Sequence, residues 1–360
     1  MREVIAEIEA WKKAGRAVAI ATNVKKGGAS LRPLGAKMAM TEGQNIAGSV
    51  TGGCIEGTVF EEAMEVIRSG EPKLLHYGVP AEETPWEVGL SCGGTLDVFV
   101  ETMDSPGWQA VFPVLKKCLE DHQVVAAVTV IAGRGMGSKM LVWPDGRTAG
   151  SLGSAELDKE AAAWARQQIQ MKETSWTHLA GAEVFVDVLT PPARLIVIGA
   201  VHIAIPLVTL AKTLDFHTVV IDPRKAFATR DRFPHVDELI LEWPATALEK
   251  LRPDEGTCIA VISHDEKFDN PALQVALASP ACYVGVLGTR KKLPQRLAAL
   301  QELGVPEEQL QRLRAPIGMN IGAILPGEIA LSILAEMVAA QHGIHRPQET
   351  QTTLPVSVVS

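Results

Sequence analysis

The sequence lacks several features that would have assigned it to a common class. Its five cysteines are odd in number and form no CxxC pair. This spacing argues against a disulfide framework and a structural zinc site, and it favours reduced thiols in a cytoplasm. There is also no excess of positive charge, because 34 Lys and Arg against 42 Asp and Glu give a formal net charge of -8. Broad electrostatic binding to nucleic acid or to an anionic membrane is therefore not expected.

A segment that targets or crosses a membrane is also missing. The N-terminal stretch MREVIAEIEAWKKAG predicts an amphipathic helix with charges throughout, which differs from a secretory signal. The most apolar stretch, ARLIVIGAVHIAIPLVTLA, contains Arg194, His202 and Pro206 and divides into strand, turn and helix. We interpret it as a buried βα unit, and we expect a cytoplasmic protein without an integral membrane segment.

A length of 360 residues predicts two domains rather than a single core. In residues 1–190 the order strand, hairpin, helix, strand occurs twice, which predicts an α+β domain with an internal duplication and halves of about 1–105 and 106–190. A pair of prolines then indicates a linker. Residues 193–341 alternate short apolar strands with helices, which predicts a Rossmann-like, doubly wound parallel sheet. Residues 342–360 are expected to form a tail.

The stretch GSVTGGCIEG joins a predicted strand to a predicted helix and contains the first candidate site. Gly52 and Gly53 are expected to leave backbone N–H groups open to an anionic ligand, and the helix N-terminus adds positive potential. That potential favours the thiolate form of Cys54, whereas the carboxylate of Glu56 opposes it. The alternative is a small cysteine packed at a tight junction. The second half of the domain has GSAELD here, without the double glycine or the cysteine, which favours a functional role.

A second glycine-flanked cysteine, Cys92 in GLSCGG, stands just before another predicted strand. Two such cysteines in one domain suggest a shared pocket, and the alternative for Cys92 alone is a structural role. No acid–base pair or nucleophilic triad emerges from the spacing of polar residues. The sequence therefore gives no independent indication of catalysis.

The stretch RLIVIGAVHIA, followed about twenty residues later by Asp222 at the end of the next strand, is arranged like a dinucleotide-binding unit. Gly199 and Ala204 fit the first and third positions of the GxGxxG/A pattern. Val201 replaces the second glycine, which normally lets the backbone approach the pyrophosphate. The pattern therefore predicts the fold more strongly than it predicts a bound nucleotide.

Polar residues follow the predicted strands of this domain, at the sheet edge where open α/β sheets bind ligands. The segment GTRKK, which contains Arg290, is suited to a phosphate or a carboxylate. The alternatives are a loop-entry hydrogen bond for His264 and Asp265, and a solvated turn for GTRKK. The candidates at these strand ends are Asp222, Arg224, His264, Asp265 and Arg290.

Together these motifs resemble the XdhC/CoxI family, whose members help to mature molybdenum hydroxylases such as xanthine dehydrogenase. The similarity extends over nearly the whole chain. It includes GAKM, GSVTGGCIEG and SCGG in the first domain, and VIGAVHIAIPLVTLAK, DPRKAFATRDRFP, SHDEKFDNPAL, GVLGTRKK, APIGMNIGA and EIALSILAEMVA in the second. The sequence departs from the family at Val201, where GAGH is usual, and this departure counts against NAD(P) or another nucleotide as a cofactor.

The resemblance implies a chaperone that binds the molybdenum cofactor, protects it during sulfuration and inserts it into an apo-hydroxylase of the xanthine dehydrogenase type. It also implies a homodimer and, as a further partner, a cysteine desulfurase. One competing hypothesis is an NAD(P)-dependent oxidoreductase that uses the second domain. Another is a scaffold that joins a sulfurtransferase to the hydroxylase without binding the cofactor.

In this interpretation Cys54 is the main contact to molybdenum or sulfur, because a thiolate suits a soft metal or a sulfur-transfer step. Arg32 and Lys37 are candidates to meet the phosphate of molybdopterin, and Glu56 is a candidate to orient a proton or a pterin nitrogen. The full set of candidate cofactor contacts is Arg32, Lys37, Gly52, Gly53, Cys54, Glu56, Cys92, Gly199, His202, Asp222, Arg224, His264, Asp265 and Arg290.

Overall fold

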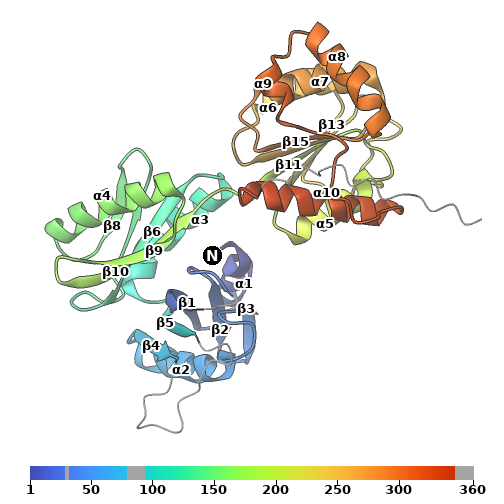
Figure 1. Cartoon of the computed structure of the whole chain (residues 1–360). Coiled ribbons are helices and arrows are strands. Elements are labelled where there is room, and N and C mark those ends of the chain that lie inside the picture. Colours follow the sequence, from blue (N-terminus) through green and yellow to red (C-terminus); the bar gives the residue numbers. More distant parts are fainter. Residues whose placement is uncertain (29–31, 79–93, 345–360) are drawn as a thin grey trace, which may run out of the picture. The chain divides into compact units, whose positions relative to one another are not determined.

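The computed structural model describes residues 1–28, 32–78 and 94–344 (Figure 1). The chain divides into two compact units, Met1–Pro191 and Pro192–Ser360. No helix in the described ranges is long and apolar enough to cross a lipid bilayer. The expected tail, residues 342–360, lies outside the described residues from residue 345 onward.

The first unit consists of two halves with the same order of elements. The elements of the first half are α1 (Arg2–Lys13), β1 (Val18–Gly27), β2 (Lys37–Thr41), β3 (Asn45–Gly48), α2 (Glu56–Ser69), β4 (Lys73–Tyr77) and β5 (Thr95–Thr102). The elements of the second half are α3 (Pro106–Glu120), β6 (Val125–Ala132), β7 (Lys139–Val142), β8 (Thr148–Ser151), α4 (Ala155–Met171), β9 (Ser175–Leu179) and β10 (Ala182–Leu189).

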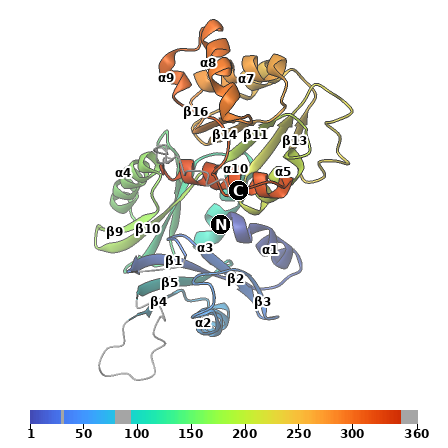
Figure 2. The same cartoon turned by 45° about the vertical axis from the view of Figure 1, so that its right-hand side comes forward.

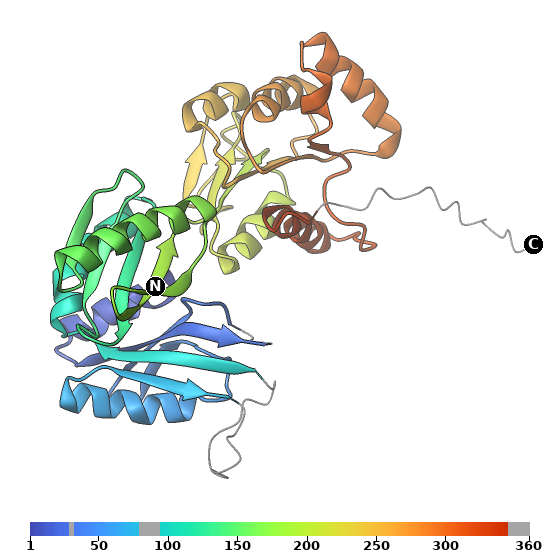
Figure 3. The same cartoon turned by 60° about the vertical axis from the view of Figure 1, so that its left-hand side comes forward.

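Each half forms an antiparallel sheet, and the two sheets have the same topology. The strand orders are β3-β2-β1-β5-β4 and β8-β7-β6-β10-β9. Helix α2 covers one face of the first sheet and α4 covers one face of the second (Figure 3). The opposite faces share a core with α1 and α3, so β2 and β7 are buried at every position. The internal repeat predicted from the order of elements is therefore present in the structure.

The two halves also share a glycine in the third strand, at its last residue in β3 and one residue earlier in β8. Gly48 and Gly150 have φ of 73° and 86°. A Cβ at Gly48 would lie 2.3 Å from the carbonyl oxygen of Lys37, and one at Gly150 would lie 2.4 Å from that of Lys139. Only glycine fits this positive φ and this close approach of two backbones. The turn that leads towards α2, and its counterpart before α4, are fixed in this way.

The second unit alternates strands and helices. Its elements are β11 (Arg194–Ile198), α5 (Ala204–Thr213), β12 (His217–Ile221), β13 (Glu238–Ile240), α6 (Pro244–Leu251), β14 (Thr257–Val261), α7 (Glu266–Ala278), β15 (Tyr283–Val286), η1 (Arg290–Lys292), α8 (Leu293–Glu302), α9 (Glu307–Leu310), β16 (Leu313–Arg314) and α10 (Pro326–Gln341).

These elements form the predicted doubly wound sheet. The strands are parallel throughout and have the order β13-β12-β11-β14-β15-β16. Helices α5 and α10 pack on one face, and α6, α7 and α8 pack on the other (Figure 2). The order reverses between β11 and β14, so the crevice that binds ligands in such sheets lies beyond the carboxyl ends of these strands.

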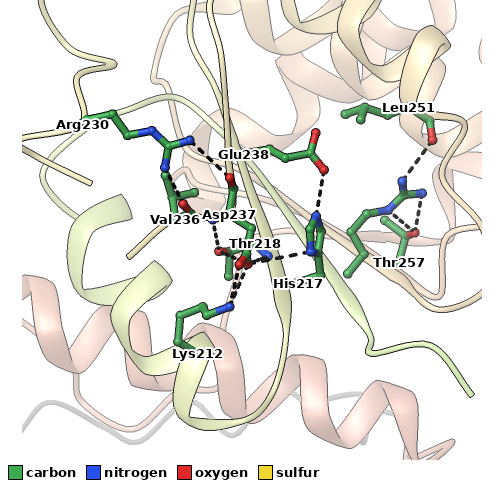
Figure 4. A network of polar contacts seen from close by, with 10 residues as sticks. Lys212, His217, Thr218, Arg230, Val236, Asp237, Glu238, Leu251 and Thr257 are labelled. Atoms are coloured by element: carbon green, nitrogen blue, oxygen red, sulfur yellow. Dashed lines mark hydrogen bonds and ion pairs between the residues drawn. The ribbon is translucent and has the colours of Figure 1, made fainter. Parts of the chain in front are cut away.

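At the opposite side of the sheet, where β12 and β13 begin, polar side chains form a hydrogen-bonded network (Figure 4). Asp237 accepts hydrogen bonds from Lys212 Nζ at 2.8 Å and from the N–H and hydroxyl of Thr218 at 2.8 and 2.9 Å. Arg230 donates to the carbonyl oxygens of Val236 and Asp237. Because these groups satisfy one another at the amino ends of β12 and β13, we assign this edge a structural role.

Candidate functional site

Cys54 lies on an exposed turn between β3 and α2. Its backbone N–H donates to Thr51 Oγ1 at 3.2 Å. The preceding Gly52 and Gly53 have φ of 92° and 129°, which L-residues rarely adopt, although a Cβ at either position would meet nothing within 4 Å. Both glycines are therefore required by the backbone conformation. They present the cysteine at the surface of the first unit and not in its core.

The carboxylate of Glu56 fills the inside of this turn. Oε1 accepts hydrogen bonds from the N–H groups of Thr51 and Gly52, both at 2.8 Å. Oε2 accepts from Gly53 N at 2.9 Å and from Thr51 Oγ1 at 2.5 Å. Gly52 and Gly53 were expected to leave these N–H groups open to an anionic ligand, but an anion of the protein already binds them. That expectation is wrong, because the Glu56 side chain folds back from the first turn of α2.

The pKa of Glu56 is lowered by the hydrogen bonds that this turn donates to its carboxylate. Partial burial by itself would raise the pKa of Glu56. Hydrogen bonds from the side chains of Thr51 and Ser49, and from the N–H groups of Thr51 and Gly52, outweigh burial and lower the pKa to about 2. Glu56 is therefore ionised at neutral pH, with its charge committed to the turn.

The second half closes its corresponding turn with another acid. Asp158 accepts hydrogen bonds from Ser151 Oγ at 2.7 Å and from Leu152 N at 2.6 Å, just where the chain enters α4. A carboxylate that closes the strand-to-helix turn is therefore common to both halves. What the first half adds is the pair of glycines and Cys54.

We expect Glu56→Gln to loosen the turn. The loss of the charged acceptor should speed backbone hydrogen exchange in a peptide spanning Gly52 and Gly53 by about ten-fold at pH 7. In the wild type the folded pKa of about 2 lies below the ordinary value of 4.5, so the carboxylate contributes fully above pH 4.5 and loses its contribution as the pH falls towards 2. Hydrogen exchange read by mass spectrometry measures both effects. The matched control Asp158→Asn should speed exchange only at its own turn, and unchanged exchange in Glu56→Gln would refute this role.

Arg32 and Asn23 hold the same turn from outside. Arg32 Nε donates to the carbonyl oxygen of Ser49 at 3.2 Å, and its Nη2 pairs with Glu3 Oε2 at 2.5 Å, so the cation beside the turn already has an anionic partner. Asn23, which is fully buried in β1, donates from Nδ2 to the carbonyl oxygen of Val50 at 2.7 Å. Sequence reasoning missed Asn23, although a polar residue inside an apolar strand is the signal that would have found it. The predicted residues that the structure brings together here are Arg32, Gly52, Gly53, Cys54 and Glu56.

Lys37 does not join this group. Its Nζ lies 2.7 Å from Asp187 Oδ2 of the other half, and the side chain is buried in the core shared by the two sheets. The matching Lys139 pairs with Glu101 of the first half, also at 2.7 Å. The two ion pairs line a cavity of about 20 Å³, which has room for about one water molecule. The prediction that Lys37 meets a phosphate is wrong, because its charge is neutralised in the interior.

The other cysteines lie apart from the turn or outside the described residues. Cys92 is outside them, so a pocket shared with Cys54 stays a prediction. Cys118 is buried in the core of the first unit. In the second unit the sulfur atoms of Cys258 and Cys282 are 3.5 Å apart, and this contact together with burial raises the pKa of Cys258. Within the described ranges no three His, Cys, Asp or Glu side chains are grouped to bind a metal ion.

In the second unit Gly199 is required by packing. It has φ of 106°, and a Cβ there would lie 2.6 Å from the Cα of Ser263, two residues after β14. The glycine is needed whether or not a ligand binds. Val201 packs against the core on the α5 side, and His202 is exposed on the same turn.

Asp222 is engaged by its own neighbours. Its side chain is 1% exposed and accepts hydrogen bonds from Ala200 N at 2.8 Å and from Arg224 Nε and Nη2 at 2.9 and 2.7 Å. Burial alone would raise the pKa of Asp222, but the hydrogen bonds from Arg224 and Ala200 lower it. In a dinucleotide site this carboxylate would bind a ribose hydroxyl. Here it holds the glycine turn and fixes the guanidinium of Arg224.

The remaining candidates lie where β14 and β15 end. His264, with φ of 63°, lines a cavity of about 70 Å³ together with Lys292 and Arg296. The side chain of Asp265 caps α7 by accepting a backbone N–H, which is the loop-entry hydrogen bond considered as its alternative. Arg290 begins η1 and does not line this cavity. Lys292 of the segment GTRKK lines this cavity at the ligand-binding edge of the sheet, whereas Arg296 pairs with Asp269 at 3.3 Å. That the segment binds a phosphate or a carboxylate stays a prediction.

Family profiles match both units of the chain. The profile described as the XdhC and CoxI family matches residues 11–78 and 118–179. The profile described as the XdhC Rossmann domain matches residues 195–337. These ranges include the turn with Cys54 and all of the parallel sheet of the second unit except Arg194, the first residue of β11.

Individual proteins are similar over almost the full length. A Bacillus subtilis (strain 168) protein, named as a probable subunit of xanthine dehydrogenase, is 26% identical and covers 89% of this chain and 92% of its own. The Escherichia coli (strain K12) protein named molybdenum cofactor insertion chaperone PaoD is 28% identical, and the match covers 95% of this chain and 88% of that protein. A crystal structure described as a xanthine dehydrogenase from Bacillus halodurans has a TM-score of 0.76 at 25% identity. The match covers 97% of this chain and 98% of that one.

Proposed function

Because the chain belongs to the XdhC and CoxI family, we propose that it is a chaperone that binds the molybdenum cofactor and inserts it into an apo-hydroxylase of the xanthine dehydrogenase type. The name of the similar Escherichia coli protein supports the cargo, and that of the Bacillus subtilis protein supports the class of recipient. The observation that carries the proposal is the exposed Cys54 on a turn whose hydrogen bonds are complete without a ligand.

The turn suits a cargo that must be held and then released. A cysteine sulfur is a soft ligand and binds a soft metal centre or a sulfur atom. The hydrogen bonds to Glu56 fix the turn in advance, so little conformational entropy is lost when the cargo binds. Arg32 lies beside the turn with its guanidinium paired to Glu3, and it can meet the phosphate of the cofactor when this partly exposed ion pair opens. The N–H groups of Gly52 and Gly53 take no part in this, because Glu56 uses them.

The proposal also includes a homodimer in the cytoplasm and a cysteine desulfurase as the sulfur donor. The alternative of an NAD(P)-dependent oxidoreductase is not favoured. Val201 stands where the dinucleotide pattern has its second glycine, and Asp222 is already engaged by Ala200 and Arg224. A dinucleotide would have to break these contacts in order to bind in the usual way.

Purification from a host that makes the cofactor tests the proposal. We expect molybdenum and pterin to copurify with the chain and to pass to an added apo-hydroxylase, which becomes active as the chaperone loses metal. Molybdenum is measured by mass spectrometry and pterin by fluorescence after oxidation. A chain that captures the apo-hydroxylase but carries neither molybdenum nor pterin would instead be the scaffold considered above.

A further inference from the structure

Four side chains from three strand ends of the second unit form one connected cluster, the aromatic platform: Arg224, Phe227, Trp243 and Phe268. The guanidinium carbon of Arg224 lies 4.2 Å from the ring centroid of Phe227 and 5.8 Å from that of Phe268. Trp243 meets Phe268 edge to face, with the centroids 5.0 Å apart. The contacts therefore run without a break from Phe227 through Arg224 and Phe268 to Trp243.

The platform is exposed to solvent at the edge of the sheet that binds ligands. Trp243 is 57% exposed and Phe227 is 40% exposed. Arg224 and Phe227 follow β12, Trp243 follows β13, and Phe268 lies in the first turn of α7 after β14. A cluster of exposed aromatic rings marks an interaction site more often than a scattered single ring does. Its position beyond the carboxyl ends of parallel strands favours a small ligand.

The platform is held in place before any ligand binds. Two hydrogen bonds from its guanidinium to Asp222 fix the plane of Arg224, and Asp222 is anchored to the N–H of Ala200. Arg232 Nη1 donates to the carbonyl oxygens of Ala200 and Phe227 at 3.0 and 2.6 Å. The loop after β12 is thus attached to the glycine turn. The loop therefore loses little conformational entropy when a ligand stacks on the platform.

We propose that the aromatic platform binds a planar heteroaromatic ring by stacking. Such a ring is the nucleobase of a nucleotide or the ring system of a pterin. Aromatic side chains and guanidinium planes both stack on rings of this kind, whatever their substituents. This mode needs no pyrophosphate path over Val201, because the ring is held from the ends of β12, β13 and β14.

The neighbouring cavity fits a phosphate attached to the same ligand. Its lining includes His264 and Glu266, which lie within four residues of Phe268, together with Lys292 and Arg296. Lys292 supplies the cation for such an anion, whereas Arg296 already pairs with Asp269 Oδ2 at 3.3 Å and Glu266 adds a carboxylate. A phosphorylated ring compound therefore combines the two features of this edge.

Titration of the purified full-length chain tests the platform directly. The probes are AMP, CMP and neopterin, and binding is read by calorimetry and by quenching of tryptophan fluorescence. We expect saturable binding of at least one probe, and we expect Trp243→Ala and Phe227→Ala each to weaken it by about ten-fold. The matched control is Trp176→Ala, which removes an exposed tryptophan of the first unit that contacts His178 and should leave the affinity unchanged.

The three probes separate the two ligand classes. Binding of AMP or CMP alone assigns a nucleotide, and binding of neopterin alone assigns a pterin. The absence of saturable binding of all three probes overturns the proposal, and so does full affinity in both platform variants when circular dichroism shows them folded. The inference does not rest on the chaperone function, because the titration uses added ligands and no copurified molybdenum is measured.

Discussion

Replacing Cys54 with serine is expected to abolish retention of the molybdenum cofactor. Serine is close to cysteine in size and keeps the backbone N–H that donates to Thr51 Oγ1, but its hydroxyl is not a soft ligand. We expect the molybdenum and pterin that copurify with Cys54→Ser to fall by at least about ten-fold, as one lost ligand bond of about 1.4 kcal/mol would already cause. The free energy of unfolding should change by less than about 0.5 kcal/mol, because the residue is exposed.

Cys282→Ser is the matched control for this experiment. Cys282 is also exposed but lies in the second unit, beside Cys258. This variant should retain cofactor like the wild type. If Cys54→Ser retains normal amounts of molybdenum and pterin, the sulfur of Cys54 does not hold the cargo.

Replacing Lys139 with methionine is expected to destabilise the first unit more than any other change considered above. Lys139 and Glu101 are 4% and 2% exposed, so the variant leaves a carboxylate unpaired in the core. We expect the free energy of unfolding at pH 8 to fall by about 3–5 kcal/mol. Chemical denaturation followed by circular dichroism measures the loss.

The pH dependence distinguishes this mechanism from a simple packing defect. Burial raises the pKa of Glu101, and in the variant Lys139 no longer opposes that effect. The folded state then binds a proton more readily than the unfolded state, so the variant loses stability as the pH rises above the ordinary value of 4.5. The deficit relative to the wild type should therefore be smaller at pH 5 than at pH 8.

Two further variants complete the test. The double change Lys139→Met and Glu101→Leu removes both charges and should recover most of the lost stability. Lys12→Met removes a surface pair with Asp104, whose atoms are also 2.7 Å apart, and should cost less than about 1 kcal/mol. A loss in Lys139→Met that does not change with pH, or that the double change fails to relieve, would contradict the expected role of the buried charge.

Features encoded in short stretches could be predicted from the sequence. Apolar runs such as RLIVI and HTVVI predicted strands buried on both faces, because a strand under helices needs no polar side. The equivalence of Lys37 and Lys139 at the start of corresponding strands followed from the order of elements alone. Val201, which stands where the dinucleotide pattern has a glycine, predicts a poor dinucleotide site for a local steric reason, and this stays a prediction.

Other features depend on where a side chain points after the chain has folded. Glu56 was correctly placed beside Cys54, but the sequence did not show that its carboxylate would fold back onto the N–H groups of Gly52 and Gly53. The sequence predicted a phosphate contact for Lys37, and this was wrong because the side chain pairs with Asp187, 150 residues away along the chain. No local pattern indicates a contact at that separation.

The sequence by itself therefore determined the two kinds of sheet and the internal repeat, because periodicity and glycine positions are local properties of the chain. Its motifs also carried the resemblance to the family. Only the tertiary structure decided which charges face each other in the core, which carboxylate satisfies the Cys54 turn, and that Phe227, Trp243 and Phe268 meet around Arg224. These contacts join residues from separate strands and loops. Their free energy depends on distance in space, which the spacing of residues along the chain does not specify.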